Sequence, residues 1–174
     1  MNQGFSDQLI AVLPRLRRFA RGLTRSAVEA DDLVQSACER ALSRAHQFQE
    51  GTRFDSWMFR IVQTIWIDQV RAREVRKEQS DDELELGGDD AVRQIEARLS
   101  LRQVQAALQD LPAEQRVVLL LVTVDGLSYK EAAEVAEVPV GTIMSRLARA
   151  RLALHARLEA SGTLGRRRDD AEAR

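Results

Sequence analysis

Cysteine, histidine and long apolar runs are scarce in this chain of 174 residues. Cys38 is the only cysteine, so a disulfide within the chain is excluded. His46 and His155 are far apart in sequence and have no ligand partner at a useful spacing, so we expect neither a metal site nor a cofactor. The longest apolar run, residues 117–122, is far shorter than the roughly 20 residues of a membrane span. The first residues also lack a signal-peptide pattern, which predicts a soluble cytoplasmic protein.

The net charge of −1 conceals an uneven distribution of charge along the chain. Residues 77–98 carry 8 Asp/Glu against 3 Lys/Arg, whereas residues 1–76 carry 9 against 12 and residues 99–158 carry 6 against 7. Neither flanking segment is strongly basic. Because neutralisation of phosphates supplies most non-specific DNA binding, we expect weak affinity for DNA alone and a partner that holds the protein on DNA.

Residues 126–154 are predicted to form two short helices joined by a tight turn. Ser128 followed by Glu131 is a capping box, and Pro139 suits the first position of the second helix. One face of that helix is apolar, with Ile143, Leu147, Ala150 and Leu154 at helical spacing. The opposite face carries hydroxyl and guanidinium groups, namely Thr142, Ser145, Arg146, Arg149 and Arg151. This face suits phosphates and guanine edges in a DNA major groove, and the alternative is an amphipathic helix with a solvated basic face.

Three helices are predicted in the first 77 residues. The first covers residues 5–23, the second begins at a capping-box signature formed by Ser26 and Glu29, and the third covers residues 54–77. Pro14 either kinks the first helix or begins its main part. The first turn of the second helix exposes Asp31, Asp32 and Gln35. Carboxylates at a helix start are favourable to the helix dipole, so a structural role and a binding role both remain open.

The third predicted helix is aromatic as well as apolar, with Phe54, Trp57, Phe59 and Trp66. Not all four rings can face one core stripe. Aromatic rings beside cationic side chains suit the binding of single-stranded nucleic acid, because the bases stack on the rings while the cations bind the phosphate backbone. The alternative is a core role, which accounts for Phe54, Met58 and Ile61 and for one of the two tryptophans.

Residues 78–98 are too polar and acidic to build a core, which predicts a flexible linker. Fully extended, about twenty residues span roughly 65 Å, so the units on either side could sit well apart. After the linker, apolar residues at helical spacing predict two further helices, over residues 99–111 and 113–124, with Pro112 between them. Neither an internal repeat nor a convincing strand is found. We therefore expect an all-α fold of two small helical domains, residues 5–77 and 99–158, with a linker at residues 78–98 and a disordered tail at residues 159–174.

Three segments in a specific order carry a resemblance to a known family. They are Ala-Asp-Asp-Leu-Val-Gln at residues 30–35, Phe-Asp-Ser-Trp-Met-Phe-Arg-Ile at residues 54–61, and Leu-Pro-Ala-Glu-Gln-Arg at residues 111–116, the last running into the helix-turn-helix. From about residue 9 to residue 158, the chain resembles the extracytoplasmic-function group of bacterial RNA polymerase sigma factors. The resemblance implies a protein that is no enzyme by itself, binds core RNA polymerase and directs transcription initiation. Its second domain would read the promoter −35 duplex, and its first would capture the opened −10 strand.

The resemblance also implies roles for individual residues and partners. It implies that Asp31, Asp32 and Gln35 bind the clamp helices of the largest polymerase subunit. It also implies that the protein contacts the flap of the second-largest subunit. The residues implied to contact the −10 strand are Phe48, Arg53, Trp57, Arg60 and Thr64. Many relatives have asparagine at the position of Thr64. The residues implied to contact the −35 duplex are Thr142, Ser145, Arg146, Arg149 and Arg151. An inhibitory anti-sigma factor is an expected partner, because the surfaces meant for polymerase and single strand would be exposed.

Two other classes of function have less support. A stand-alone repressor or activator would use the helix-turn-helix as a dimer, but the chain offers no clear dimer helix or effector domain. A helical hydrolase or metal enzyme lacks a Ser/His/Asp order, a paired-His motif or a Gly-rich phosphate loop. The sigma-factor interpretation requires Arg146 and Arg149 to be accessible, and Asp31 and Gln35 to point outward.

Overall fold

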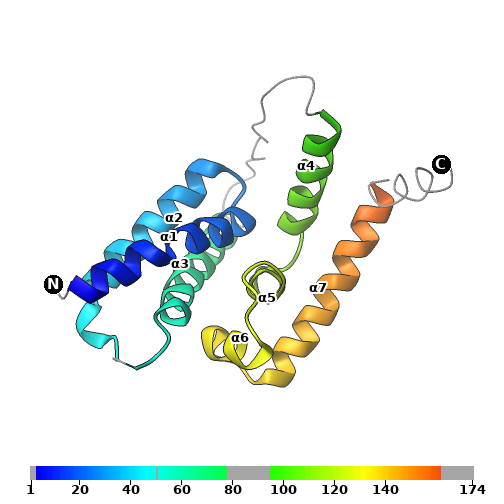
Figure 1. The fold of residues 1–174 in the computed structure, drawn as a ribbon. Helices are drawn as coiled ribbons and strands as arrows, with labels where there is room; N and C mark the ends of the chain where they lie inside the picture. Colours follow the sequence, from blue (N-terminus) through cyan, green and yellow to red (C-terminus); the bar gives the residue numbers. More distant parts are fainter. Residues whose placement is uncertain (1–2, 50, 78–94, 162–174) are drawn as a thin grey trace, which may run out of the picture.

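The computed structural model describes residues 3–49, 51–77 and 95–161, and these residues form helices and connections without a strand (Figure 1). This confirms the predicted all-α fold. Three helices build an N-terminal unit: α1 (Gln3–Leu23), α2 (Ala27–Ser43) and α3 (Phe54–Lys77), with a short 3-10 helix η1 (Ala45–Gln47). Four build a C-terminal unit: α4 (Ile95–Gln109), α5 (Ala113–Thr123), α6 (Tyr129–Ala136) and α7 (Val140–Ala160). None of the helices in the described ranges is long and apolar enough to cross a membrane.

The N-terminal unit follows the apolar stripes of its sequence. Phe19 of α1 and Phe59 of α3 are fully buried, and their rings meet edge to face with centroids 5.2 Å apart. Ser26 caps α2 as predicted, because its side chain accepts a hydrogen bond from the backbone N–H of Glu29 over 3.1 Å. The Glu29 carboxylate accepts from the backbone N–H of Arg25, so the expected reciprocal bond of a capping box is replaced by one to the preceding residue.

Pro14 lies inside α1, which is one helix from Gln3 to Leu23, so of the two alternatives at this proline the beginning of a helix is excluded. Proline lacks a backbone N–H and removes one bond of the helical ladder, but packing of the apolar stripe on both sides of it keeps the helix continuous. Val12 and Leu16 of that stripe are buried on either side of Pro14.

The C-terminal unit is built around α5, whose residues 116–121 are all buried. Ser128 and Glu131 form the complete capping box at the start of α6, with a 2.8 Å bond from the Ser128 N–H to the Glu131 carboxylate. Glu137 ends α6 in the left-handed conformation at φ 53°, which few residues with a β-carbon adopt. Pro112 and Pro139 are the N-cap residues of α5 and α7, because both have extended ψ angles. Helix α5 therefore begins at Ala113, as predicted, and α7 begins at Val140, one residue after the expected first position at Pro139.

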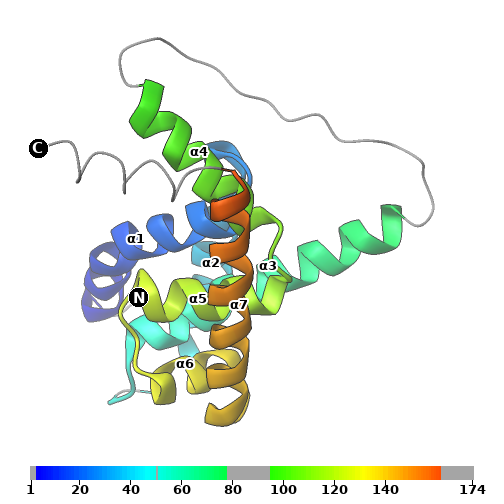
Figure 2. The same cartoon turned by 90° about the vertical axis from the view of Figure 1, so that its right-hand side faces the viewer.

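The two units pack against each other, although the sequence alone allowed them to sit apart. In Figure 1 the N-terminal unit lies to the left and the C-terminal unit to the right. Helix α1 contacts α4 and α5, and α3 contacts α5 and α6. Gly22 marks a close approach of the two units, since a β-carbon there would lie 2.6 Å from a methyl group of Leu120. In Figure 2 the last turns of α3 extend beyond the C-terminal unit, consistent with the exposure of residues 71–76. The predicted linker lies outside the described residues up to residue 94, and α4 begins at Ile95, four residues before the expected Leu99.

Candidate nucleic-acid interface

The acidic first turns of α2 are open to solvent. Asp31, Asp32 and Gln35 are exposed, as the sigma-factor interpretation requires. Gln35 donates a 3.1 Å hydrogen bond to Glu39 one turn later, so both side chains lie on the outer face of the helix. Val28 in the first turn is 70% exposed, which adds an apolar group next to the carboxylates. A surface of this kind can contact a partner protein through charge and a small apolar area.

Four aromatic rings gather where η1 leads into α3. Phe48 packs against Phe54 and Trp57 with centroids 5.1 Å and 5.4 Å apart, and Phe5 of α1 contacts the same three rings. Phe54 is buried, whereas Phe48 and Trp57 are half-buried and keep part of their faces at the surface. The predicted −10 residues Phe48 and Trp57 therefore lie together. Phe5 was not predicted to belong to this cluster, because nothing in the local pattern links it to a loop more than forty residues away.

The other two rings of α3 are in the core. Phe59 is 0% exposed and Trp66 is 3% exposed, so neither can stack on a base in this structure. Trp66 is covered by the guanidinium of Arg116, whose central carbon lies 5.1 Å from the ring centroid. Helix α3 buries more aromatic rings than a single apolar stripe could hold, because the N-terminal unit covers one side of it and the C-terminal unit covers another.

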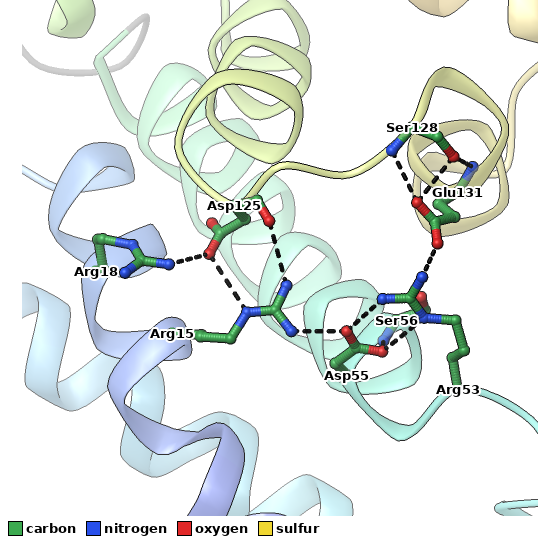
Figure 3. Close-up of polar contacts among 8 residues, drawn as sticks. All are labelled: Arg15, Arg18, Arg53, Asp55, Ser56, Asp125, Ser128 and Glu131. Atoms are coloured by element: carbon green, nitrogen blue, oxygen red, sulfur yellow. Dashed lines mark hydrogen bonds and ion pairs between the residues drawn. The ribbon is translucent and has the colours of Figure 1, made fainter.

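The cationic residues of α3 and the loop before it contact the C-terminal unit. Arg53 pairs with Asp55 over 2.7 Å and with Glu131 of α6 (Figure 3). Arg60 donates a 2.6 Å hydrogen bond to the backbone oxygen of Glu134 and pairs with the Glu137 carboxylate over 3.3 Å. Thr64 is exposed and donates its hydroxyl hydrogen to the Arg60 carbonyl oxygen. Two predicted −10 cations therefore have oxygen acceptors of α6 as partners.

The polar face of α7 is where the sequence placed it. Ile143, Leu147 and Ala150 are buried and form the predicted apolar stripe, and Leu154 is half-buried against the same core. On the other side, Ser145, Arg149 and Arg151 are exposed, and Thr142 is half-buried. Ser145 donates to the Thr142 carbonyl oxygen over 3.0 Å, so its hydroxyl follows the helix.

Three of the five predicted −35 side chains, those of Ser145, Arg149 and Arg151, are thus exposed, whereas Arg146, like Thr142, is partly buried. Its side chain is 22% exposed and pairs with Glu114 of α5 over 2.6 Å. Arg149 and Arg151 have no partner within the described part of the chain, so their guanidinium groups are available for phosphate or base edges.

One cavity of about 260 Å³ lies between α3 and the C-terminal unit. Thr64 of the predicted −10 set and Arg146 of the predicted −35 set both line it. Asp68 and Arg71 of α3 and Glu137 at the C-cap of α6 contribute further charged groups. Two sets of side chains that the sequence assigned to separate promoter elements therefore face one space.

Asp125, in the connection between α5 and α6, joins the C-terminal unit to α1 (Figure 3). Its carboxylate accepts from Arg18 over 3.0 Å and lies 3.8 Å from the Arg15 Nε. The side chain is completely buried, and burial raises the pKa of the Asp125 carboxyl above its ordinary value in spite of both cations. Hydrogen bonds from Arg53 and then from Arg15 hold the pKa of Asp55 well below its ordinary value.

The described residues include no group of three side chains that could hold a metal ion. Cys38 is half-buried against the N-terminal core, and burial raises the pKa of its thiol, with Arg17 acting in the opposite direction. A raised pKa keeps the thiol protonated and unreactive, as expected of a cysteine that packs in an apolar stripe.

Family models match both units of the chain. The model for sigma-70 region 4 matches residues 101–154, and the model for the sigma2 domain of PhyR matches residues 9–63. Among individual relatives, the ECF RNA polymerase sigma factor EcfG of Rhodopseudomonas palustris is 36% identical over 162 residues, which are 93% of this chain and 89% of the relative.

Solved structures share the arrangement of helices. The sigma factor RpoE of Bartonella quintana, in complex with the anti-sigma factor NepR, superposes with a TM-score of 0.77 at 32% identity and covers 90% of this chain and 98% of its own. A PhyRSL–NepR complex from Sphingomonas sp. Fr1 superposes with a TM-score of 0.61 at 25% identity, over 90% of this chain and 88% of the other.

The two helical units, the helix-turn-helix and the matched family models define a transcription initiation factor of the sigma-70 class. Within that class, the chain belongs to the extracytoplasmic-function RNA polymerase sigma factors, because EcfG is similar over nearly its whole length. The chain is therefore a sigma factor that directs transcription initiation, and a stand-alone repressor or activator is not favoured.

Proposed function

We propose that this sigma factor binds core RNA polymerase through the outer face of α2, reads the −35 duplex with α7, and captures the −10 strand with the rings and cations around the start of α3. It has no catalytic activity of its own and acts in the cytoplasm, where core polymerase is found. The observation that carries the proposal is the polar face of α7, on which Arg149 and Arg151 are exposed without partners among the described residues.

The α7 face supports duplex recognition because of its residue types and its place. It belongs to the second helix of a helix-turn-helix, the helix that enters the major groove in this motif. Arginine can donate two hydrogen bonds to a guanine edge, and each good pair of this kind contributes about 1–3 kcal/mol of discrimination.

The ring cluster supports capture of a single strand. Phe48 and Trp57 keep exposed area beside a well-packed base of Phe5 and Phe54, so a flipped base could stack without reorganising the core. Arg53 and Arg60 lie next to this cluster along the chain and would contact the strand's phosphates. Thr64 would occupy the position where many relatives have asparagine.

The partner surfaces are assigned in the same way. Asp31, Asp32 and Gln35 would dock on the clamp helices of the largest polymerase subunit, and the C-terminal unit on the flap of the second-largest subunit. Because NepR is the partner in both superposed complexes, the proposed inhibitor is an anti-sigma factor of the NepR type. Large apolar side chains that would be open to it include Leu101 and Leu152, which are 67% and 74% exposed.

Run-off transcription with core polymerase, on promoters selected from a random library by the reconstituted holoenzyme, tests the proposal. We expect no specific transcript without the sigma factor and a defined start site with it. The double substitution Asp31→Asn with Asp32→Asn should abolish assembly, whereas Asp7→Asn with Glu74→Gln, which neutralises two exposed carboxylates elsewhere, should leave it intact. Tight promoter binding by the protein alone, together with no transcript, would instead support the repressor or activator alternative.

A further inference from the structure

Two apolar side chains stand on the outer surface of α7 near its start. Met144 is 54% exposed and Val140 is 40% exposed. At about 3.6 residues per turn, the two residues lie one above the other along the helix. A single exposed apolar side chain is ordinary on a protein surface, so the place of Met144 in the fold decides what it can contact.

Met144 lies in the segment of the helix-turn-helix that contacts base edges. In this motif the N-terminal residues of the second helix enter the major groove. Helix α7 begins at Val140, so Met144 is its fifth residue and belongs to its second turn. Arg149, to which we assign a −35 contact, is exposed further along the same helix. Met144 therefore stands among the side chains that would read bases, and its role rests on the proposed −35 function of α7.

Small residues occupy the surface between Met144 and Arg149. Gly141 and Ala148 are both exposed, and helical geometry places them between the other two side chains. A β-carbon added at Gly141 would meet nothing within 4 Å, and its φ is not in the left-handed region, so the fold itself does not require glycine there. Because glycine is less favourable than alanine in a helix, the missing side chain is explained by close approach of a group from outside the chain.

The chemistry of methionine favours one base over the other three. Its thioether sulfur is only a weak acceptor, so Met144 cannot satisfy the donors and acceptors of a base edge. Placed over the amino group of cytosine or the acceptors of guanine, it would exclude water without replacing the lost hydrogen bonds, which is unfavourable. Thymine is the base that presents an apolar group, its 5-methyl, in the major groove. The flexible methionine side chain can adapt its shape to such a group.

We propose that Met144 is a specificity-determining residue of the −35 contact and packs against the 5-methyl group of a thymine, while Gly141 lets the helix approach the bases closely. Arg149 and Met144 then read different features of the element, because a guanine edge accepts hydrogen bonds and a thymine methyl group gives apolar contact. The −35 element of this sigma factor therefore contains, on one of its strands, a thymine whose methyl group contributes to binding.

Replacing thymine with deoxyuridine removes the 5-methyl group and keeps the base pair, so it isolates this contact. Holoenzyme made from core polymerase and the full chain is titrated with a selected promoter in which each −35 thymine is replaced in turn, and binding is measured by competition in fluorescence anisotropy. We expect the wild-type affinity to fall about threefold to fourfold at one position, as when one methyl group loses apolar contact. The same replacement should change the affinity of the Met144→Ala holoenzyme by about 1.5-fold or less. Met144→Leu keeps an apolar side chain and should retain the response.

Val75→Ala is the matched control, because Val75 of α3 has the same exposed fraction of 54%. Its holoenzyme should respond to deoxyuridine as the wild type does. Thermal unfolding of the Met144 variants should match that of the wild type, since the side chain lies outside the core. A deoxyuridine response that persists in Met144→Ala, or no response of the wild type at any −35 thymine, would overturn the role of Met144.

Gly141→Ala tests the close approach. We expect equal or higher thermal stability of the free protein and at least about threefold weaker promoter binding by the holoenzyme, because the added methyl group would occupy space next to the bases. The control is Gly4→Ala, which also changes the second residue of a helix and also meets nothing within 4 Å. Equal promoter affinities for these two variants would overturn the role of Gly141.

Scrambling the whole −35 element tests the proposed function separately. Wild-type binding that is unchanged by scrambling would overturn the −35 role of α7 itself. Binding that weakens on scrambling but responds to deoxyuridine at no position would overturn the Met144 contact alone and leave the proposed function intact.

Discussion

Arg116 of α5 donates a 2.8 Å hydrogen bond to the backbone oxygen of Leu23 at the end of α1. The same guanidinium donates to Gln109 and to the Leu111 carbonyl oxygen, and it lies over the Trp66 ring of α3. One side chain thus connects both units. Burial, followed by the nearby charge of Arg25, lowers the pKa of Arg116 to about 10, so the guanidinium is still charged at neutral pH.

Replacing Arg116 with methionine should destabilise the protein by about 2–4 kcal/mol, because several buried carbonyl oxygens lose a charged donor. The measurement is the midpoint and slope of urea unfolding, followed by circular dichroism. Arg102→Met is the matched control, since Arg102 is exposed on α4, and its effect should stay within about 0.5 kcal/mol. Equal midpoints for the two variants would show that the Arg116 bonds contribute nothing to stability.

Gly22 should not tolerate a β-carbon while Leu120 is present. Alanine gains up to about 1 kcal/mol over glycine in a helix, but the contact with Leu120 at 2.6 Å should cost about 1–3 kcal/mol. We expect Gly22→Ala to lower the melting temperature and Gly4→Ala, in the same helix with nothing within 4 Å, to leave it equal or higher. Combining Gly22→Ala with Leu120→Ala should show a favourable coupling in a double-mutant cycle.

Asp55 should make the stability of the protein depend on acid pH. Its pKa is lower in the folded protein than the ordinary value of 3.8, chiefly through the hydrogen bond from Arg53. The contribution is therefore complete above about pH 4 to 5 and is lost as the pH falls through the folded-state pKa. Asp55→Asn should cost about 1.5–3 kcal/mol at pH 7, and the difference from wild type should shrink toward pH 2 in urea titrations. A difference that is constant over this pH range would contradict the assignment.

Arg149→Ala should reduce run-off transcription from selected promoters by about tenfold or more, because an arginine pair with a guanine edge contributes about 1–3 kcal/mol. Folding should be unaffected, since Arg149 is exposed and has no partner within the described ranges. The matched control is Arg102→Ala on α4, which should transcribe like the wild type. If promoters selected with the Arg149→Ala holoenzyme show an unchanged −35 sequence, Arg149 does not read a base.

Much of the fold could be predicted because its signals are local. Ser26 and Ser128 cap the helices that they were expected to cap, and the stripe of Ile143, Leu147 and Ala150 is buried as its spacing indicated. Capping and helical periodicity depend on residues three to four positions apart, so neighbouring residues contain the information. The outward position of Asp31 and Gln35 followed from the same periodicity.

The sequence by itself determined the helices, the helix-turn-helix and the family, since each depends on short segments in a fixed order. Only the tertiary structure decided which cations are free and which have partners. Arg60 donates a hydrogen bond to the carbonyl oxygen of Glu134, which is 74 residues away in sequence. Arg116 donates one to the carbonyl oxygen of Leu23, which is 93 residues away. Such pairs depend on how two separately patterned units come together, and no local spacing encodes that packing.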